Sequence, residues 1–445
     1  MRSLIVTTIL LAAIPAAGQN TDIEALSGLQ FNFSNPGARS LGMGGAFIAR
    51  ADDATAAEAN PAGLTILRRA EVAVDIRDVS VTQTAPAGGT WPWLATIDAP
   101  ARDLDVSFAS IVIPLGDFAV AGSYARRLDF HNQIDLIGRY GTPVFHVGPA
   151  GLISEEDCAA AGADCRRFQI YPFSALVDIE LESWSLTGAW RRGPLSFGLG
   201  LRYSDFSEST RVRRIDLDRE GQPEFLIEQV NGSQAFGSDH DSDITFVSGV
   251  KWEISEAWCA GAVYKKGASF PAPVYAGLAA EGDQGLHRMG TPRFHVPDLA
   301  GVGASWRPAP LLTLSADVVW VEYSNLTDGF LSVIEFESPD DVESVAGYGT
   351  DDGIEPHAGV EYFLPFKVPL ALRAGWWREA AHEIAFGGDV RTLHDGAAAI
   401  LFPGGEDEDH WALGFGLSWP RFQIDVAFDR SESASVGSLS MVVRR

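Results

Sequence analysis

Alternation of apolar and polar residues is the strongest pattern along this chain. Between residues 195 and 203 every second side chain is apolar: Leu195, Phe197, Leu199, Leu201 and Tyr203. The same period recurs at 312–320, 411–419 and 422–428. Because successive side chains of a strand point to opposite faces, this period predicts β-strands that are apolar on one face only.

Segments of this kind occupy most of the chain after residue 70. We predict fourteen strands, at 71–83, 103–113, 117–129, 174–191, 194–209, 241–253, 256–268, 296–307, 309–323, 354–363, 368–378, 409–419, 420–429 and 434–444. The polar faces of these strands carry several charged residues: Arg202, Asp317, Arg373, Asp425 and Asp429. In a wide barrel such residues would line a hydrated lumen.

Short turns and long connections alternate between the predicted strands. Tight turns are expected at Gly116-Asp117, Arg192-Gly193, Ser255-Glu256, Pro308-Ala309, Pro365-Phe366 and Pro420. The intervening connections are long, at 130–173, 210–240, 269–295, 324–353 and 379–408. Bacterial membrane barrels have an even number of antiparallel strands, with short periplasmic turns and longer outer loops. The pattern therefore favours an all-β transmembrane antiparallel β-barrel over a soluble β-sandwich, which alternation alone would also allow.

Composition supports a membrane barrel once the alternation is recognised. Of the 445 residues 46% are hydrophobic, yet the chain holds no internal run of about 20 apolar residues that would form a spanning helix. The formal net charge of -26 argues against a protein that binds nucleic-acid phosphate. Four tryptophans lie near predicted tight turns and are typical of an aromatic girdle at a membrane surface: Trp190, Trp252, Trp306 and Trp419.

The first eighteen residues have the composition of a secretory signal peptide. Arg2 precedes an apolar stretch at 4–14, and Ala16-Ala17-Gly18 supplies small residues for cleavage before Gln19. We therefore expect residues 1–18 to be removed and the mature protein to leave the cytoplasm. The expected location is the bacterial outer membrane.

Export from the cytoplasm also bears on the cysteines. In an oxidising compartment Cys158 and Cys165, which enclose a short loop, would form a disulfide. Cys259 is left without a partner and is expected to act as a small apolar strand residue.

The segment before the first strand is rich in glycine and alanine. Residues 37–45 hold four glycines in nine positions. Residues 52–59 predict a short helix with an acidic first turn, which must end early because the residue before Pro61 is disfavoured in helices. Asn60 and Pro61 are suited to begin a second helix, so two short helices are predicted over 52–68.

These motifs resemble the FadL/TodX family of outer-membrane transporters of hydrophobic compounds. The similarity rests on three N-terminal motifs and on weaker matches in the barrel: Gly37-Ala38-Arg39 with LGMGGAF at 41–47, Ala51-Asp52-Asp53-Ala54, Asn60-Pro61-Ala62-Gly63-Leu64, and the regions 296–299, 312–317 and 372–376. The resemblance implies a barrel at 71–445 that is closed by an N-terminal hatch at 19–70. The residues it implies for the hatch or gate are Asn60, Pro61, Ala62, Gly63, Gly42, Gly44 and Gly45.

The resemblance also implies a function. A hydrophobic molecule, such as a long-chain fatty acid or an aromatic hydrocarbon, would be captured among the outer loops and enter the barrel. It would leave through an opening in the wall once the hatch moves. The expected partners are this ligand, outer-membrane lipids and the barrel assembly machinery. A monomer without a cofactor is expected.

Two apolar stretches in the predicted outer loops are candidates for ligand capture. They contribute Phe270, Val274, Tyr275 and Leu278 from one loop, and Phe145 and Leu152 from another. Packing of the loops without a ligand accounts for these residues equally well. The acidic runs at 406–409 and 239–243 are more typical of a solvated surface than of a cation site, so no metal site is predicted.

Two other functions remain open. A barrel that assists protein secretion would share the same N-terminal motifs and differ only in its partner. A hydrolase would need a nucleophile, a base and an orienting carboxylate within hydrogen-bond reach. The nine histidines fall in or beside predicted outer loops, and none belongs to a recognisable catalytic motif, so an enzyme is not predicted.

Overall fold

The protein is described from a computed structural model. The structure describes residues 31, 33–135, 144–149, 151–169, 173–214, 225–226, 229–230, 233–278, 287–291, 293–328, 347–391 and 393–445. The predicted signal peptide lies outside the described residues.

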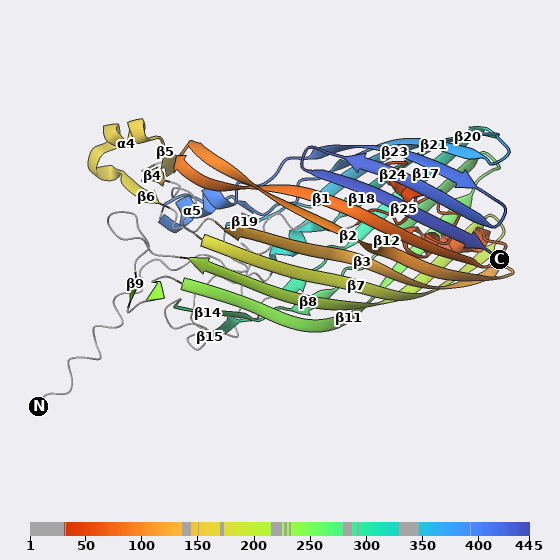
Figure 1. Ribbon diagram of the computed structural model, residues 1–445, viewed down its shortest axis with the longest axis horizontal. Helices are drawn as coiled ribbons and strands as arrows, with labels where there is room; N and C mark the ends of the chain where they lie inside the picture. Colours follow the sequence, from red (N-terminus) through yellow and green to blue (C-terminus); the bar gives the residue numbers. More distant parts are fainter. Residues whose placement is uncertain are drawn as a thin grey trace, which may run out of the picture.

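Fourteen antiparallel strands close into a barrel, which confirms the predicted fold class (Figure 1). Each strand pairs with the next along the chain, and β25 pairs with β1 to close the ring. The strands are β1 (Glu71–Thr90), β2 (Trp93–Leu115), β3 (Phe118–Asp135), β7 (Phe173–Arg192), β8 (Leu195–Arg214), β11 (Ser233–Glu253), β12 (Trp258–Lys265), β17 (Leu299–Ala309), β18 (Leu312–Val321), β20 (Gly353–Leu364), β21 (Leu370–Glu379), β23 (Glu408–Ser418), β24 (Phe422–Arg430) and β25 (Ala434–Arg444).

Several strands are longer than the sequence predicts, and the largest difference lies in the first two. The stretch 84–102, expected to be a connection, continues β1 and β2 as a hairpin that is paired up to Thr90 and Trp93. Pro86, Gly88 and Pro100 interrupt the alternation there, and the register shifts between Pro86 and Gly88. A bulge keeps the pairing despite residues that disfavour a regular strand.

The apolar face of each strand points outward, and the polar face points into the lumen. In β8, Leu199 and Leu201 are 56% and 60% exposed, whereas Arg202 and Ser204 are 6% and 2% exposed. A protein surrounded by water would have the opposite arrangement, because burying apolar area is what stabilises it. Within the described residues, no helix is long and apolar enough to cross a membrane.

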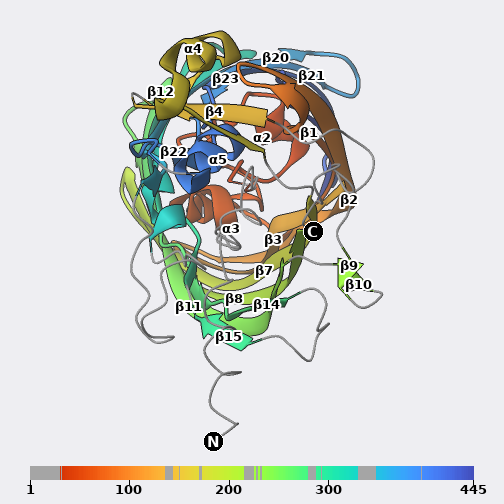
Figure 2. The ribbon, with the colours of Figure 1, turned by 90° about the vertical axis from the view of Figure 1, so that its left-hand side faces the viewer.

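The smaller elements gather at the rim opposite the tight turns. β4 and α5 lie across the mouth of the barrel, and α4 projects beyond it (Figure 2). These elements are β4 (Val144–Gly148), β5 (Gly151–Ile153), α4 (Glu155–Ala161), η2 (Gly162–Asp164), β6 (Arg166–Gln169), β9 (Phe225–Leu226), β10 (Gln229–Val230), β13 (Ser269–Pro271), β14 (Val274–Leu278), β15 (His287–Gly290), β16 (Arg293–His295), η4 (Tyr323–Thr327), β19 (Tyr348–Gly349), β22 (Ala385–Phe386) and α5 (Leu393–Leu401).

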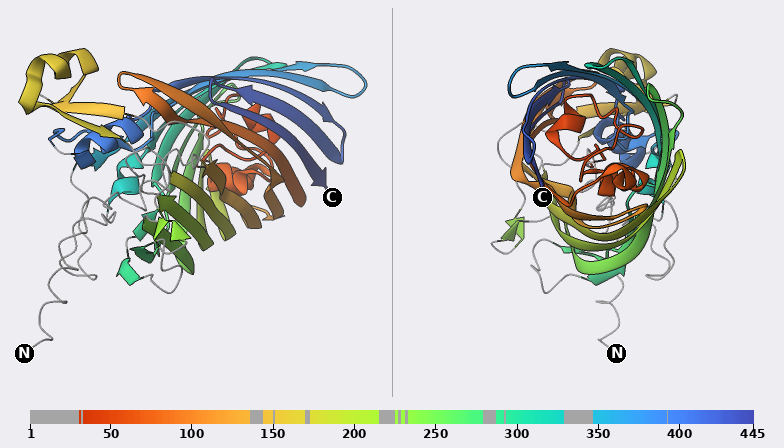
Figure 3. Two further views of the ribbon diagram at one scale, coloured as in Figure 1. Left: turned by 60° about the vertical axis from the view of Figure 1, so that its left-hand side comes forward. Right: turned by 90° about the vertical axis from the view of Figure 1, so that its right-hand side faces the viewer.

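Of the predicted hatch, the structure describes residue 31 and residues 33–70. Three short helices of this segment lie inside the barrel (Figure 3): α2 (Ala38–Leu41), α3 (Ala56–Ala59) and η1 (Pro61–Ile66). The helix predicted from residue 52 begins only at residue 56, because Asp53 Oδ1 accepts hydrogen bonds from the backbone N–H and the hydroxyl of Thr55. Such a local bond competes with the first helical turn.

Candidate functional site

An apolar cavity of about 340 Å³ lies in the lumen between the hatch and the rim opposite the tight turns, which we call the outer rim. Side chains of several strands line it, among them Leu128, Phe130, Val263, Leu299 and Val319. The hatch contributes Ile48 and a leading segment, which we define as Phe31 and residues 33–35. This volume is within the range of about 300–1,000 Å³ that is usual for small-molecule sites.

The Asn60-Pro61 corner of the hatch rests against glycines of the barrel wall. The Asn60 amide donates to the carbonyl oxygens of Ile48 (3.0 Å) and Val250 (3.2 Å), and its Oδ1 accepts from the N–H of Ala62 (3.2 Å). A Cβ on Gly249 would lie 2.1 Å from Asn60 Oδ1, and one on Gly198 would lie 2.4 Å from the Pro61 carbonyl carbon. Only glycine at these wall positions lets the corner approach so closely.

The hatch glycines make a second close contact on the opposite wall. Gly44 has a φ of 61°, and a Cβ there would lie 2.7 Å from the backbone N of Trp376. A Cβ on Gly42 would lie 2.9 Å from the Cα of Gly414. Gly45 also has a positive φ, of 76°. Gly63 lies against the backbone of the hatch itself, because a Cβ there would be 2.2 Å from the carbonyl oxygen of Ala51. The residues implied by the family resemblance therefore lie where the hatch meets the wall or folds on itself.

A buried network of charges anchors the first part of the hatch. Arg39 Nε and Nη2 each lie 2.9 Å from a carboxylate oxygen of Glu361, and Nη1 lies 2.6 Å from Asp52 Oδ1. Glu361 also pairs with Arg373 at 2.9 Å, and Arg373 pairs with Asp425 at 2.7 Å. Burial opposes ionisation of Asp52, but the charges of Arg39 and Arg50 hold the pKa of Asp52 well below its ordinary value.

A wall carboxylate holds the neighbouring loop of the hatch. Asp317 Oδ2 accepts hydrogen bonds from the backbone N–H groups of Phe47 (2.6 Å) and Ile48 (2.8 Å). The sequence placed Asp317, Arg373 and Asp425 on the lumen face, and the structure shows that they bind the hatch or its partners. Pattern analysis could identify the face but not the contact.

A second buried cluster surrounds a single hatch carboxylate. Glu58, on α3, contacts Arg127 and lies 3.1 Å from Arg202 Nη2 and 3.0 Å from Lys265 Nζ. We call Arg127, Arg202 and Lys265 the cationic triad. Sequence reasoning missed it, because its members come from β3, β8 and β12, and the only signal was the polar face of each strand.

The barrel wall is incomplete between two of its strands. Backbone pairing of β2 with β3 runs only from Phe108 and Ala125 to Leu115 and Phe118. Beyond that point β2 pairs with β1 alone, and β3 pairs with β7. The β1–β2 register shifts between Asp75 and Ile76, and the β3–β7 register shifts between Arg126 and Leu128. Bulges of this kind bend β2 and β3 away from each other where their pairing ends. We call this unpaired stretch toward the outer rim the wall gap.

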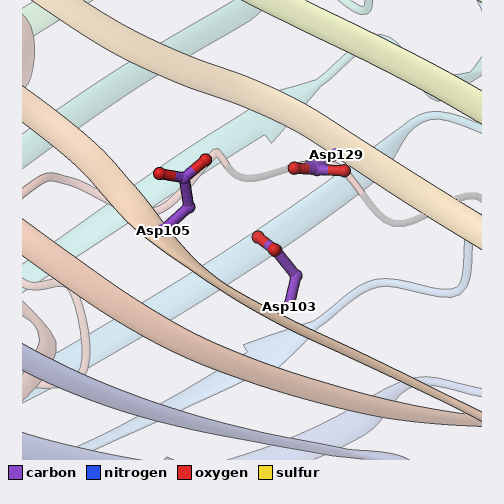
Figure 4. A group of neighbouring side chains, drawn as sticks. All are labelled: Asp103, Asp105 and Asp129. Atoms are coloured by element: carbon purple, nitrogen blue, oxygen red, sulfur yellow. The ribbon is translucent and has the colours of Figure 1, made fainter.

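Charged side chains line the wall gap. The carboxylates of Asp103 and Asp105 on β2 and of Asp129 on β3 face one another, with oxygens within 4.8 Å (Figure 4). Arg126 contacts Asp105 and Asp129 and lies 3.1 Å from a Glu182 oxygen. The three aspartates and Arg126 also line the apolar cavity, so the cavity reaches the wall gap. Arg126 thus joins β2 to β3 through side chains where backbone pairing has ended.

The structure does not bring the predicted capture residues together at one site. Phe270 is fully buried and stacks on Phe206 with ring centroids 4.8 Å apart, and Val274 is buried on the paired β14 strand. Phe145 is fully buried with Val147 and Ile400, and Leu152 packs against that group. None of these lines the apolar cavity, nor does Tyr275. The side chain of Leu278 lies outside the described residues.

Two of the cysteines form a disulfide, and one lumen histidine is held by carboxylates. Cys158 and Cys165 are joined by a disulfide on the exposed α4 region, with Cα atoms 5.4 Å apart. His410 is the most enclosed histidine at the cavity: Nδ1 lies 2.7 Å from Asp429 and Nε2 lies 3.0 Å from Glu379. Both of its ring nitrogens are engaged by carboxylates, so neither is free to activate a nucleophile.

Comparison with known proteins identifies the fold. No family model matches the chain, and no curated protein matches it. A FadL homologue from Pseudomonas aeruginosa is similar in structure, with a TM-score of 0.62 and 15% identity over 94% of this chain and 100% of that one. The toluene transporters TbuX of Ralstonia pickettii and TodX of Pseudomonas putida give TM-scores of 0.54 and 0.52, each at 14% identity over 93% of this chain and 99% and 98% of theirs. The chain therefore has the fold of the FadL/TodX structures, as its N-terminal motifs predicted.

Proposed function

We propose that this chain is a bacterial outer-membrane protein that takes up hydrophobic molecules. The apolar cavity carries the proposal, because it lies inside a barrel with an apolar outer face and reaches the wall gap. An apolar solute is poorly soluble in the hydrated layers outside the bilayer. A protected route that ends sideways in the membrane would spare it from entering water.

The likeness in fold supports this proposal. Two of the similar structures are named toluene transporters, and a third is named a FadL homologue. The internal apolar cavity suits a hydrophobic ligand, so it favours uptake over a barrel that only assists secretion. We expect the barrel to act as a monomer that is surrounded by outer-membrane lipids after insertion by the assembly machinery.

The leading segment is the part of the hatch best suited to move. Phe31 and Phe33 stack on each other 5.1 Å apart, half-buried beside Phe294 and Tyr323. Asn35 is tied to Gly45 and Arg77 by single hydrogen bonds of 3.1 and 2.8 Å. An apolar ligand that enters the cavity would replace the contacts of these rings with its own.

Expulsion of the whole hatch would be far more costly. Each buried ion pair that loses one partner costs about 3–5 kcal/mol, and the hatch is held by several. A ligand that binds at micromolar concentration supplies about 8 kcal/mol in total. We therefore propose that Asn60, Pro61 and the hatch glycines keep the hatch in place, and that uptake proceeds by local movement.

The ligand would leave through the wall gap. The side-chain link from Arg126 to Asp105 and Asp129 closes this route without backbone hydrogen bonds. Such a partly exposed link is weak, at about 0–1 kcal/mol, and can open within the energy that a ligand supplies.

Uptake into proteoliposomes tests the proposal. We expect purified protein to accelerate the entry of labelled oleate and toluene relative to empty liposomes. A variant with Asp105→Cys and Asp129→Cys, joined through two disulfide bonds by a short bis-methanethiosulfonate cross-linker, should lose this activity and recover it on reduction. The wild-type protein treated with the same cross-linker is the control. Equal entry with and without protein would rule out the proposed function.

A further inference from the structure

The cationic triad carries more charge than its partner balances. Three cations surround one carboxylate, that of Glu58, and the ion pairs of the described residues join the triad to no other acid. Arg127, Arg202 and Lys265 are 7%, 6% and 5% exposed. A buried surplus of positive charge is costly unless an anion is available to balance it.

Two of the cations have unused donors. Arg127 Nε and Arg202 Nε are both buried and have no hydrogen-bond partner among the residues that the structure describes. An unpaired buried donor is destabilising, so native structures rarely keep one without a reason. The donors of the triad therefore exceed what the two oxygens of Glu58 can accept.

The triad borders a small second cavity. Its wall includes the three cations together with Ser183 and Ser204, and its volume is about 20 Å³. That is room for little more than one water molecule. Phe33, Lys265 and Leu299 line both this cavity and the apolar cavity, so the two adjoin. A ligand in the apolar cavity could place a polar end group at the triad.

We propose that the triad is a carboxylate-binding site which Glu58 occupies at rest, and that the carboxylate of an amphiphilic ligand takes its place. The second cavity is too small to admit another carboxylate beside Glu58, so binding must be an exchange. The resting occupant also defines the chemical class, because a site that fits the Glu58 side chain fits a ligand carboxylate. The ligand's hydrocarbon tail lies in the apolar cavity.

The exchange couples ligand binding to the hatch. Glu58 lies on α3, and α3 ends at Asn60, whose amide holds the carbonyl of Ile48. Displacement of Glu58 releases one anchor of the hatch, while the anchors at Arg39 and Asp317 remain. An uncharged ligand with the same tail cannot replace Glu58 and leaves α3 in place.

Binding to the full-length protein in nanodiscs tests the exchange, which rests on the proposed function. The probes are oleate and oleyl alcohol, which share a hydrocarbon tail and differ in charge. We expect Glu58→Gln to tighten oleate binding at least tenfold, because the internal competitor is gone, and to change binding of the alcohol less than twofold. Arg202→Met should weaken oleate at least tenfold and spare the alcohol. Arg191→Met, at the Glu253 ion pair near the tight-turn rim, is the matched control.

The native thiol of Cys259 provides a second measurement that needs no variant. Its Sγ donates to the carbonyl of Ala49 at 3.3 Å, next to Ile48, so movement of α3 should expose it. We expect oleate to speed alkylation of Cys259 severalfold and oleyl alcohol to leave the rate unchanged. If oleate and oleyl alcohol changed the alkylation rate equally, or if Glu58→Gln bound oleate more weakly than the wild type, the exchange would be overturned. The proposed uptake function would still stand. Failure of both probes to bind would overturn the proposed function itself.

Discussion

Two ionic clusters hold the hatch, and they differ in charge balance. Around Arg39 the cluster has three arginines, Arg39, Arg50 and Arg373, and four carboxylates, Asp52, Asp53, Glu361 and Asp425. Around Glu58 it has three cations and one carboxylate. In the first cluster every arginine has at least one carboxylate partner, which suits it to a permanent contact. The second has a surplus of positive charge, which an anionic group of a ligand can bind.

The largest expected effect comes from breaking the balanced cluster. Glu361→Gln removes the fully buried carboxylate between Arg39 and Arg373, so each arginine loses one of its carboxylate partners and the two like charges face each other without an anion between them. We expect a loss of about 3–5 kcal/mol in the anchoring of the hatch. Limited proteolysis should then cleave within 33–70, and the barrel should leak small polar solutes. Glu58→Gln, which leaves the balanced cluster intact, should leak much less; an equal leak would contradict the comparison.

A steric change should have the next largest effect. A Cβ on Gly375 would lie 2.0 Å from the backbone N of Gly44, so Gly375→Ala must push the hatch away from β21. Overpacking of this kind costs about 1–3 kcal/mol. Gly188→Ala is the control, because a Cβ there meets no atom of the described residues within 4 Å. The midpoint of thermal unfolding should fall for the first variant only; a fall of the same size in both would show that the hatch contact is not the cause.

Acid should weaken the unbalanced cluster through Glu58. Burial disfavours the ionised form, but Arg127, Arg202 and Lys265 hold the pKa of Glu58 well below its ordinary value of about 4.3. A lowered pKa contributes stability that is fully present above that ordinary value and is lost as the pH falls toward the folded-state pKa. The contribution of Glu58 to the midpoint temperature of thermal unfolding should therefore be nearly constant above about pH 5 and should decrease below about pH 4. Glu58→Gln should have a shallower acid dependence than the wild type, and identical curves would count against this assignment.

The smallest expected effect is at the wall gap. Asp105→Asn removes one partner of Arg126, and a partly exposed pair contributes about 0–1 kcal/mol. Global stability should barely change, whereas ligand exit should become faster because β2 and β3 are linked less firmly. Single-turnover release of oleate from the protein into liposomes measures this. Slower release would show that Asp105 assists exit instead of closing it.

The sequence predicted the number of strands because the relevant signal is local. A period of two and the positions of the tight turns need no knowledge of distant residues, and both are visible in stretches such as 195–203 and 411–419. The hairpin at 84–102 was missed because its pairing does not depend on alternation. The capture residues were inferred from apolar character alone, and loop packing gives Phe270 and Phe145 the same character.

The sequence by itself therefore determined the barrel, the gathering of its short turns at one rim and the presence of a glycine-rich hatch. Only the tertiary structure decided where charges meet. Arg127, Arg202 and Lys265 are separated by 75 and 63 residues, and Glu58 precedes them all. Strand register brings these side chains together, and register over such distances is set by closure of the whole ring. The cationic triad and the wall gap are consequences of that closure, which no local pattern records.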